Sequence, residues 1–255
     1  MSIFKSGNPV LSEKRFQENV GFNDGQVMTQ SGTMNKFFLM SLLLISSAVF
    51  TWNAFYQGVN IMPWMIGSVL LGFVAALVIT FKPVWGSFLA PIYALLEGVF
   101  LGSISAIYNN AFAKVAPGIV TQAVGLTFGV VIAMFVLYKF NVIKVTEQLK
   151  SIIVMATAGI AIFYLIAIVL RFFNIDIMMV SDGNRGSMLG IGISLFVVGI
   201  AALNLLLDFD RIDSLAKQGA PKYMEWYGAF GLMVTIVWLY LEILRLLSRF
   251  ASNKN

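Results

Sequence analysis

The sequence contains no cysteine and no histidine. Without cysteine, the chain has neither disulfide bonds nor thiolate chemistry. Without histidine, it has no imidazole to relay protons, bind a metal or act as the base of a catalytic triad. The His-Glu-x-x-His stretch of zinc proteases is therefore absent as well. Any response to pH near neutrality must come from carboxyl groups whose environment is unusual.

Charged residues are scarce, at 11% of 255 residues, whereas 59% of the residues are hydrophobic. A soluble domain would contain roughly 25% charged and 45–50% apolar residues. The composition therefore predicts an integral membrane protein with no soluble domain of normal size. The net charge of +5 comes from basic residues in loops beside apolar runs. Membrane topology explains this pattern better than binding to nucleic acid, which we do not expect as a partner.

Seven apolar runs follow a polar N-terminal stretch, and each approaches the roughly 20 residues that cross a bilayer. Their short connections predict that consecutive helices pack antiparallel. We expect an all-α integral membrane protein, with seven transmembrane helices in one bundle and the last helix at its centre. The runs cover residues 37–55, 62–81, 86–108, 118–138, 151–172, 187–207 and 223–247.

The same pattern divides the chain into three parts. Residues 1–36 lack the apolar region of a signal peptide and are expected to form a polar, disordered arm in the cytosol. Residues 37–250 form the transmembrane domain, and residues 251–255 form a short tail. Eleven of the 17 Lys and Arg residues lie in inside segments if the N-terminus is inside. This distribution predicts a cytosolic N-terminus and, with seven full spans, a C-terminus outside the cell.

Two points about assembly stay open. The basic residues at the end of the chain, Arg245, Arg249 and Lys254, would favour the cytosol, so a re-entrant last helix is an alternative to seven full spans. Glycine pairs four residues apart let helix backbones approach closely. We interpret them as packing motifs within one monomeric bundle, with dimerisation as the alternative. The pairs are Gly98 and Gly102, Gly125 and Gly129, and Gly186 and Gly190.

Three carboxylates are predicted at membrane depth, where a charge is expensive and indicates a functional site. Glu97 lies about 16 Å into the third run. Asp208 follows the sixth run directly and lies about 13 Å deep if Lys217 reaches the inner surface. Glu242 interrupts the seventh run; it lies about 30 Å along its helix if that helix begins at Lys222, and nearer the midplane if the buried part begins later. Two acids on neighbouring helices repel, so one holds a proton or a cation lies between them.

Each acid also has a simpler, purely structural interpretation. For Glu97 the alternative is a protonated side chain hydrogen-bonded to a helix backbone. For Asp208 and Asp210 the alternative is the start of a solvated loop, although Arg211 follows Asp208 at a spacing that places both on one helix face. In that interpretation Glu242 forms an ion pair of little energetic weight with Arg245, three residues further on.

The stretches Leu-Leu-Leu-Asp208 and Tyr-Leu-Glu242-Ile-Leu-x-Leu-Leu resemble the Bax-inhibitor family, in its bacterial branch. These are small seven-helix proteins of bacterial and organelle membranes, and the resemblance covers about residues 35–249. The family pattern has Asp at both positions, whereas here the second is Glu242. The resemblance implies that Asp208 and Glu242 form a pair that hydrogen bonding closes and rising pH opens. It also implies a basic latch at the cytosolic end of the second span, where Lys82 is the only basic residue.

The resemblance thus implies a pH-sensitive cation channel or transporter in the bacterial inner membrane, with Ca²⁺ as the permeant or weakly bound ion. Hard carboxylate oxygens suit that ion. Asp208 and Glu242 would bind it, and no tightly bound cofactor is expected. The alternative is a non-transporting regulator that binds other membrane proteins, such as a membrane protease or a stress or death factor. An enzyme is not expected, because the two acids match an intramembrane aspartyl protease poorly. The candidate pH-sensing and gating residues are Asp208, Glu242 and Lys82 from the resemblance, together with Glu97, Asp210 and Arg211 from the sequence pattern.

Overall fold

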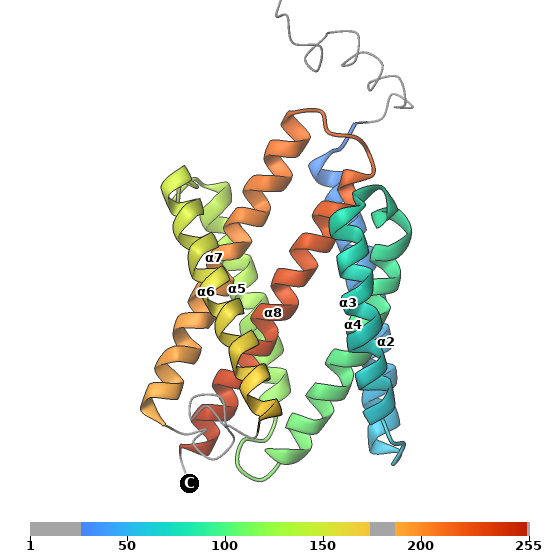
Figure 1. Ribbon diagram of the computed structural model, residues 1–255, viewed down its shortest axis with the longest axis vertical. Coiled ribbons are helices and arrows are strands. Elements are labelled where there is room, and N and C mark those ends of the chain that lie inside the picture. The colour runs from blue at the N-terminus through green and yellow to red at the C-terminus, as the bar shows by residue number, and fades with distance from the viewer. Residues whose placement is uncertain (1–26, 174–186, 254–255) are drawn as a thin grey trace, which may run out of the picture.

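Seven long α-helices make up the described part of the chain in the computed structural model, which covers residues 27–173 and 187–253 (Figure 1). All seven are long and apolar enough to cross a membrane. The all-α, seven-helix class predicted from the sequence is therefore confirmed, and the protein is an integral membrane protein. The elements are α2 (Gln30–Tyr56), α3 (Met62–Phe81), the short 3₁₀ helix η2 (Pro83–Trp85), α4 (Gly86–Ala111), α5 (Ile119–Lys139), α6 (Glu147–Phe172), α7 (Met188–Lys217) and α8 (Met224–Ser252).

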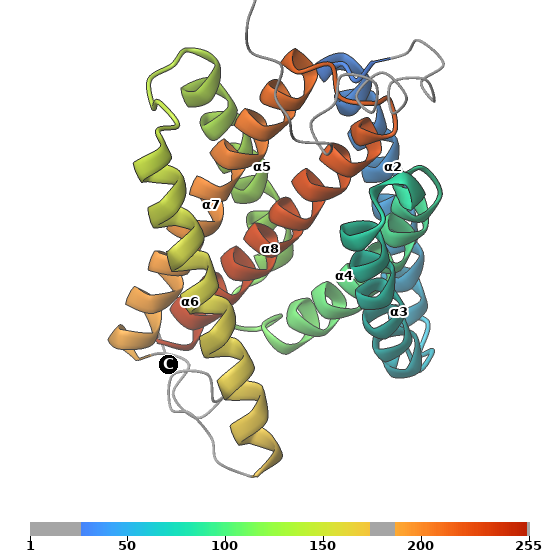
Figure 2. The ribbon, with the colours of Figure 1, turned by 45° about the horizontal axis from the view of Figure 1, so that its top comes forward.

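Helix α8 runs between two groups of three helices, with α2, α3 and α4 on one side and α5, α6 and α7 on the other (Figure 2). Its most apolar stretch is 56% buried, a larger share than in any of the other six helices. The last helix therefore occupies the centre of the bundle, as the sequence predicted. It is one uninterrupted helix from Met224 to Ser252, which is the geometry of a full span rather than of a re-entrant loop.

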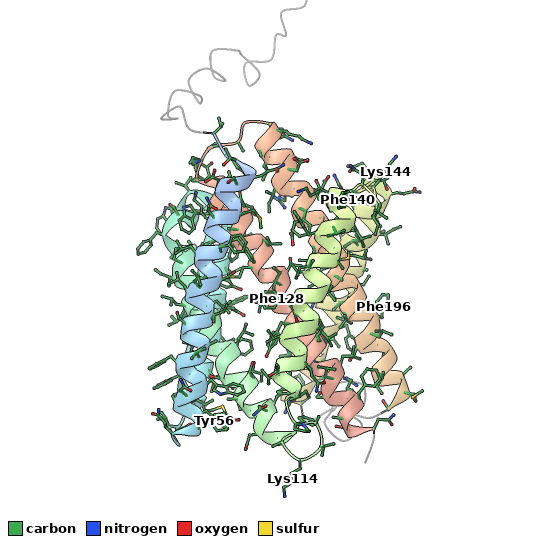
Figure 3. All side chains as sticks on the ribbon, turned by 180° about the vertical axis from the view of Figure 1, so that it is seen from behind. Tyr56, Lys114, Phe128, Phe140, Lys144 and Phe196 are labelled. Atoms are coloured by element: carbon green, nitrogen blue, oxygen red, sulfur yellow. The ribbon has the colours of Figure 1, made fainter. Side chains whose placement is uncertain are left out.

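The described chain begins and ends at opposite ends of the bundle (Figure 1). Lys114, between α4 and α5, and Lys144, between α5 and α6, likewise mark opposite ends, and Phe128 and Phe196 lie on the helices between those ends (Figure 3). Both phenylalanines are more than half exposed, as expected for side chains that face lipid.

Two helices begin earlier than the apolar runs suggested, because polar residues cap them. The Thr29 hydroxyl accepts a hydrogen bond from the backbone of Gly32, so α2 starts at Gln30 rather than at residue 37. Thr146 does the same for α6, which starts at Glu147. Of the predicted arm, residues 1–26 lie outside the described residues, whereas residues 30–36 form the first turns of α2.

The segment before α2 is tied to the turn between α7 and α8. Val27 forms an isolated antiparallel bridge with Pro221, and the backbone N–H of Met28 donates to the carbonyl of Ala220 at 2.7 Å. The side chain of Met28 is only 1% exposed. The start of the described chain therefore belongs to the packed bundle.

The three glycine pairs have different surroundings. A β-carbon on Gly98 would overlap Ser47 and Leu44 of α2, and one on Gly102 would lie 2.8 Å from Cα of Ala48. This pair packs α4 against α2, as predicted. Gly125 and Gly129 on α5 have no neighbouring heavy atom within 4 Å of such a β-carbon, so they do not pack within the described bundle. Gly190 adjoins the side chain of Arg249, and Gly186 lies outside the described residues.

Helix α6 is held separately from the main core. None of its described side chains belongs to the large apolar cluster that joins the other six helices. Its Ile160 instead packs with Val197 and Ile200 of α7 in a small second cluster. Since close van der Waals packing and polar contacts hold helices together in lipid, and α6 packs through the small cluster alone, α6 has the weakest apolar attachment of the seven.

Candidate functional site

Asp208 lies on α7 and faces the central helix α8, where the hydroxyl of Thr235 interacts with its carboxyl group. Its Oδ2 atom is buried and has no hydrogen-bond partner among the described residues. Arg211, one turn further along α7, is close enough to act on its charge. A buried carboxyl oxygen without a partner is costly, so this position is available for a proton or a cation.

Glu242 on α8 is engaged by two side chains. Its Oε1 atom accepts a hydrogen bond from the hydroxyl of Tyr164 on α6 at 3.0 Å. Nη1 of Arg245 donates to both carboxylate oxygens, at 3.0 and 3.1 Å, and to the Tyr164 hydroxyl at 2.5 Å. The Glu242 side chain is 3% exposed and the Arg245 side chain 38%, so this is a partly buried, hydrogen-bonded ion pair.

The structure does not bring Asp208 and Glu242 together as a hydrogen-bonded pair. Asp208 is level with Thr235, and Glu242 lies seven residues further along α8, which is about 10 Å. The reason is the length of the two antiparallel helices, which are joined by a short turn. Asp208 lies nine residues before the end of α7, whereas Glu242 lies 18 residues after the start of α8.

Asp210 forms an ion pair with Lys150 of α6, whose ammonium lies 2.9 Å from Oδ2. Lys150 also lies 3.0 Å from the carboxylate of Glu147. The side chains of Lys150 and Asp210 are 35% and 24% exposed. Asp210 is therefore part of the polar contact between α6 and α7, and Lys150 is a residue that the sequence interpretation missed.

A second contact between these helices lies deeper in the bundle. The amide of Asn204 donates to the hydroxyl of Thr157 at 2.8 Å and to the carbonyl of Ile200 at 2.8 Å. Asn204 precedes Asp208 by four residues, so both lie on the same face of α7. Neither Asn204 nor Thr157 was expected from the sequence, because uncharged polar residues are common in transmembrane helices.

Two other candidate gating residues, Glu97 and Lys82, lie elsewhere. Glu97 on α4 faces Gly72 of α3, where its Oε2 atom lies 3.8 Å from the position of a β-carbon. Lys82 is exposed at the end of α3, with its ammonium 5.4 Å from the ring centre of Trp85. The basic side chains that do contact carboxylates near this end of the bundle include Lys150 and Lys36.

No group of three or more Asp, Glu, His or Cys side chains within the described residues is arranged to hold a metal ion. The carboxylates instead lie at successive levels along α7 and α8.

The family model described as Bax inhibitor 1 like matches residues 8–252, nearly the whole chain. No curated protein matches the sequence.

Proposed function

Since the chain belongs to the Bax inhibitor 1 like family and spans the membrane with seven helices, we propose that it is a pH-sensitive cation leak pathway with Ca²⁺ as the permeant ion. The observation that carries this proposal is the buried Oδ2 atom of Asp208, which has no hydrogen-bond partner among the described residues. A hard, anionic oxygen at the bundle interior is a suitable transient ligand for Ca²⁺.

The response to pH follows from the surroundings of Asp208. The groups that act on its charge are the Thr235 hydroxyl from α8 and the Arg211 guanidinium from α7. The Thr235 hydroxyl carries no charge, and Arg211 forms no close ion pair with Asp208. Ionisation of the Asp208 carboxyl in this buried position is therefore costly. The neutral carboxyl binds a cation far more weakly than the carboxylate does, because it carries no charge. Flux through the bundle is therefore expected to rise with pH.

The orientation in the membrane is part of the proposal. Lys144, the N-terminal end of α2 and the turn between α7 and α8 share one end of the bundle (Figures 1 and 3). We assign this end to the cytosol, because the loops there carry most of the basic residues. The C-terminus then lies on the opposite side of a bacterial inner membrane.

A flux assay with reconstituted protein tests the function. Purified wild-type protein in lipid vesicles that contain a Ca²⁺ indicator is expected to admit Ca²⁺ faster at pH 8 than at pH 6. Asp208→Asn is expected to lose most of this flux, at least tenfold, and its dependence on pH. Asp213→Asn makes the same change nearer the end of α7, where the ion-pair partner is Lys217 with a 74% exposed side chain, and should behave as wild type.

Equal flux in wild type and Asp208→Asn would contradict the proposal. Folded wild-type protein that admits no Ca²⁺ at either pH would favour the alternative, a regulator that acts by binding other membrane proteins.

A further inference from the structure

Helix α6 carries a stripe of polar residues along one face. Lys150, Thr157 and Tyr164 are spaced seven residues apart, which is close to two helical turns, so their side chains point in the same direction. The buried apolar residues Ile153 and Ile160 lie between them at the same spacing. The stripe extends over 14 residues, or about 21 Å, which is most of the roughly 30 Å hydrocarbon thickness of a bilayer.

Each member of the stripe forms a polar bridge to α7 or α8. At one end Lys150 binds Asp210, in the middle Thr157 accepts a hydrogen bond from Asn204, and at the other end Tyr164 donates to Glu242. Together with the hydrogen bond from Arg245 to the Tyr164 hydroxyl, these bridges are the polar ties that the described residues show between α6 and its two neighbours. They form a polar seam, interrupted by the buried Ile153 and Ile160, along this side of the bundle.

Helix α6 is also the helix with the weakest apolar packing against the rest of the bundle. None of its described side chains belongs to the main apolar cluster, and it packs on α7 through a small separate one. Figure 2 shows α6 on the near side of the bundle, with α7 and α8 behind it. In lipid, exposing an apolar helix face carries little hydrophobic cost, so the three bridges account for much of the attachment.

The acidic residues of the seam belong to α7 and α8, whereas two of their partners belong to α6. Lys150 forms an ion pair with Asp210. Tyr164 donates a hydrogen bond to Glu242, which also forms an ion pair with Arg245 of α8. Asp208 lies between these two levels, on the same face of α7 as Asn204. Movement of α6 would remove Lys150 from Asp210 and Tyr164 from Glu242, and would leave these two carboxylates facing the space that α6 had covered.

We propose that the cation path runs along this seam and that α6 is the helix that moves to open it. The inference rests on the proposed function and specifies the path and the gate for the same ion. The Lys150 ammonium occupies the inner end of the closed seam, and a permeating divalent cation takes its place on Asp210 when α6 is displaced.

A matched pair of variants tests the gate. Tyr164→Phe removes only the hydroxyl that ties α6 to α8, and leaves Glu242 and Arg245 in place. Tyr240→Phe removes a comparable buried hydroxyl, which is 2.6 Å from Ser105 and ties α4 to α8 outside the seam. In the vesicle assay Tyr164→Phe is expected to raise Ca²⁺ flux about threefold or more, whereas Tyr240→Phe should leave it unchanged.

Cross-linking α6 in place should lower Ca²⁺ flux instead of raising it. Because the chain has no native cysteine, an introduced cysteine pair is the only one that can react. In Thr157→Cys/Asn204→Cys, a bifunctional thiosulfonate reagent should tie α6 to α7 and abolish flux, and reduction should restore it. The control pair Val27→Cys/Pro221→Cys replaces residues that form a backbone bridge away from the seam. Its cross-linking should leave flux unchanged.

Measuring the distance between α6 and α2 tests the movement of α6 without a transport assay. Spin labels at Leu165→Cys on α6 and Leu42→Cys on α2 both face lipid. Their distance distribution should broaden in Tyr164→Phe and not in Tyr240→Phe. If flux depends on Asp208 but both phenylalanine variants match wild type, the inference is wrong and the proposed function stands. If no variant transports Ca²⁺, the proposed function fails, and unchanged label distances then overturn the movement of α6 as well.

Discussion

Glu225, at the start of α8, occupies the space that a side chain at position 32 of α2 would need. A β-carbon built on Gly32 would overlap the carboxylate of Glu225. That carboxylate is fully buried and accepts hydrogen bonds from the backbone and the hydroxyl of Thr29, both at 2.9 Å. Its negative charge lies at the N-terminus of α2, where the helix dipole favours it. The contact therefore fastens the first described helix to the central one.

Gly32→Ala is expected to destabilise the protein by about 2 kcal/mol, because the carboxylate must move and lose its hydrogen bonds with Thr29. Thermal unfolding in detergent, followed by tryptophan fluorescence, measures the change. Gly67→Ala on α3 is the control, since no heavy atom lies within 4 Å of the new β-carbon. It should be neutral or stabilising by up to about 1 kcal/mol. Equal Tm values for the two variants would count against the contact.

Lys36→Met is expected to cost about 3 kcal/mol, because it leaves the buried Glu225 carboxylate with one cationic partner fewer. Lys222, 2.9 Å from the other carboxylate oxygen, would remain. In Glu225→Gln the same lysine change should cost much less, since no charge is left to neutralise. A double-mutant cycle of unfolding free energies measures this coupling. Additive effects would show that Lys36 and Glu225 do not interact in the folded protein.

The two glycine pairs on α4 and α5 should differ in their tolerance of side chains. Gly98→Ala forces α4 away from Ser47 and the backbone of Leu44, and is expected to lower Tm by several degrees. Gly129→Ala adds a methyl group where no neighbour lies within 4 Å, and should leave Tm the same or higher. If Gly129→Ala proves the more damaging change, α5 packs on something outside the described bundle.

The orientation can be read from single cysteines introduced into the cysteine-free chain. Asn60→Cys, between α2 and α3, should react with a membrane-impermeant maleimide in intact cells, because that end of the bundle is assigned to the outside. Gln218→Cys, in the turn after α7, should react only after the membrane is permeabilised. Wild-type protein, which has no thiol, gives the background. The reverse pattern would invert the proposed orientation.

Much of the fold was predictable because crossing a membrane is a local property of the sequence. Seven apolar runs define seven helices, and the sixth continues through its charged residues to Lys217, ahead of Gly219 with its positive φ of 69°. The start of α2 was harder to predict from the sequence, since its first turns are polar. They are helical because Thr29 caps them and Glu225 binds them, and the second contact joins residues 196 positions apart.

The candidate site shows the same division. The sequence by itself determined which acids lie among apolar residues, and the three-residue spacing made the pair of Glu242 with Arg245 readable in advance. Only the tertiary structure decided which acids are neighbours, because that depends on where two antiparallel helices begin and end. It set Asp208 beside Thr235, placed Tyr164 against Glu242, and aligned the polar face of α6 with α7. Those contacts join helices that are distant along the chain, so no local pattern of residues specifies them.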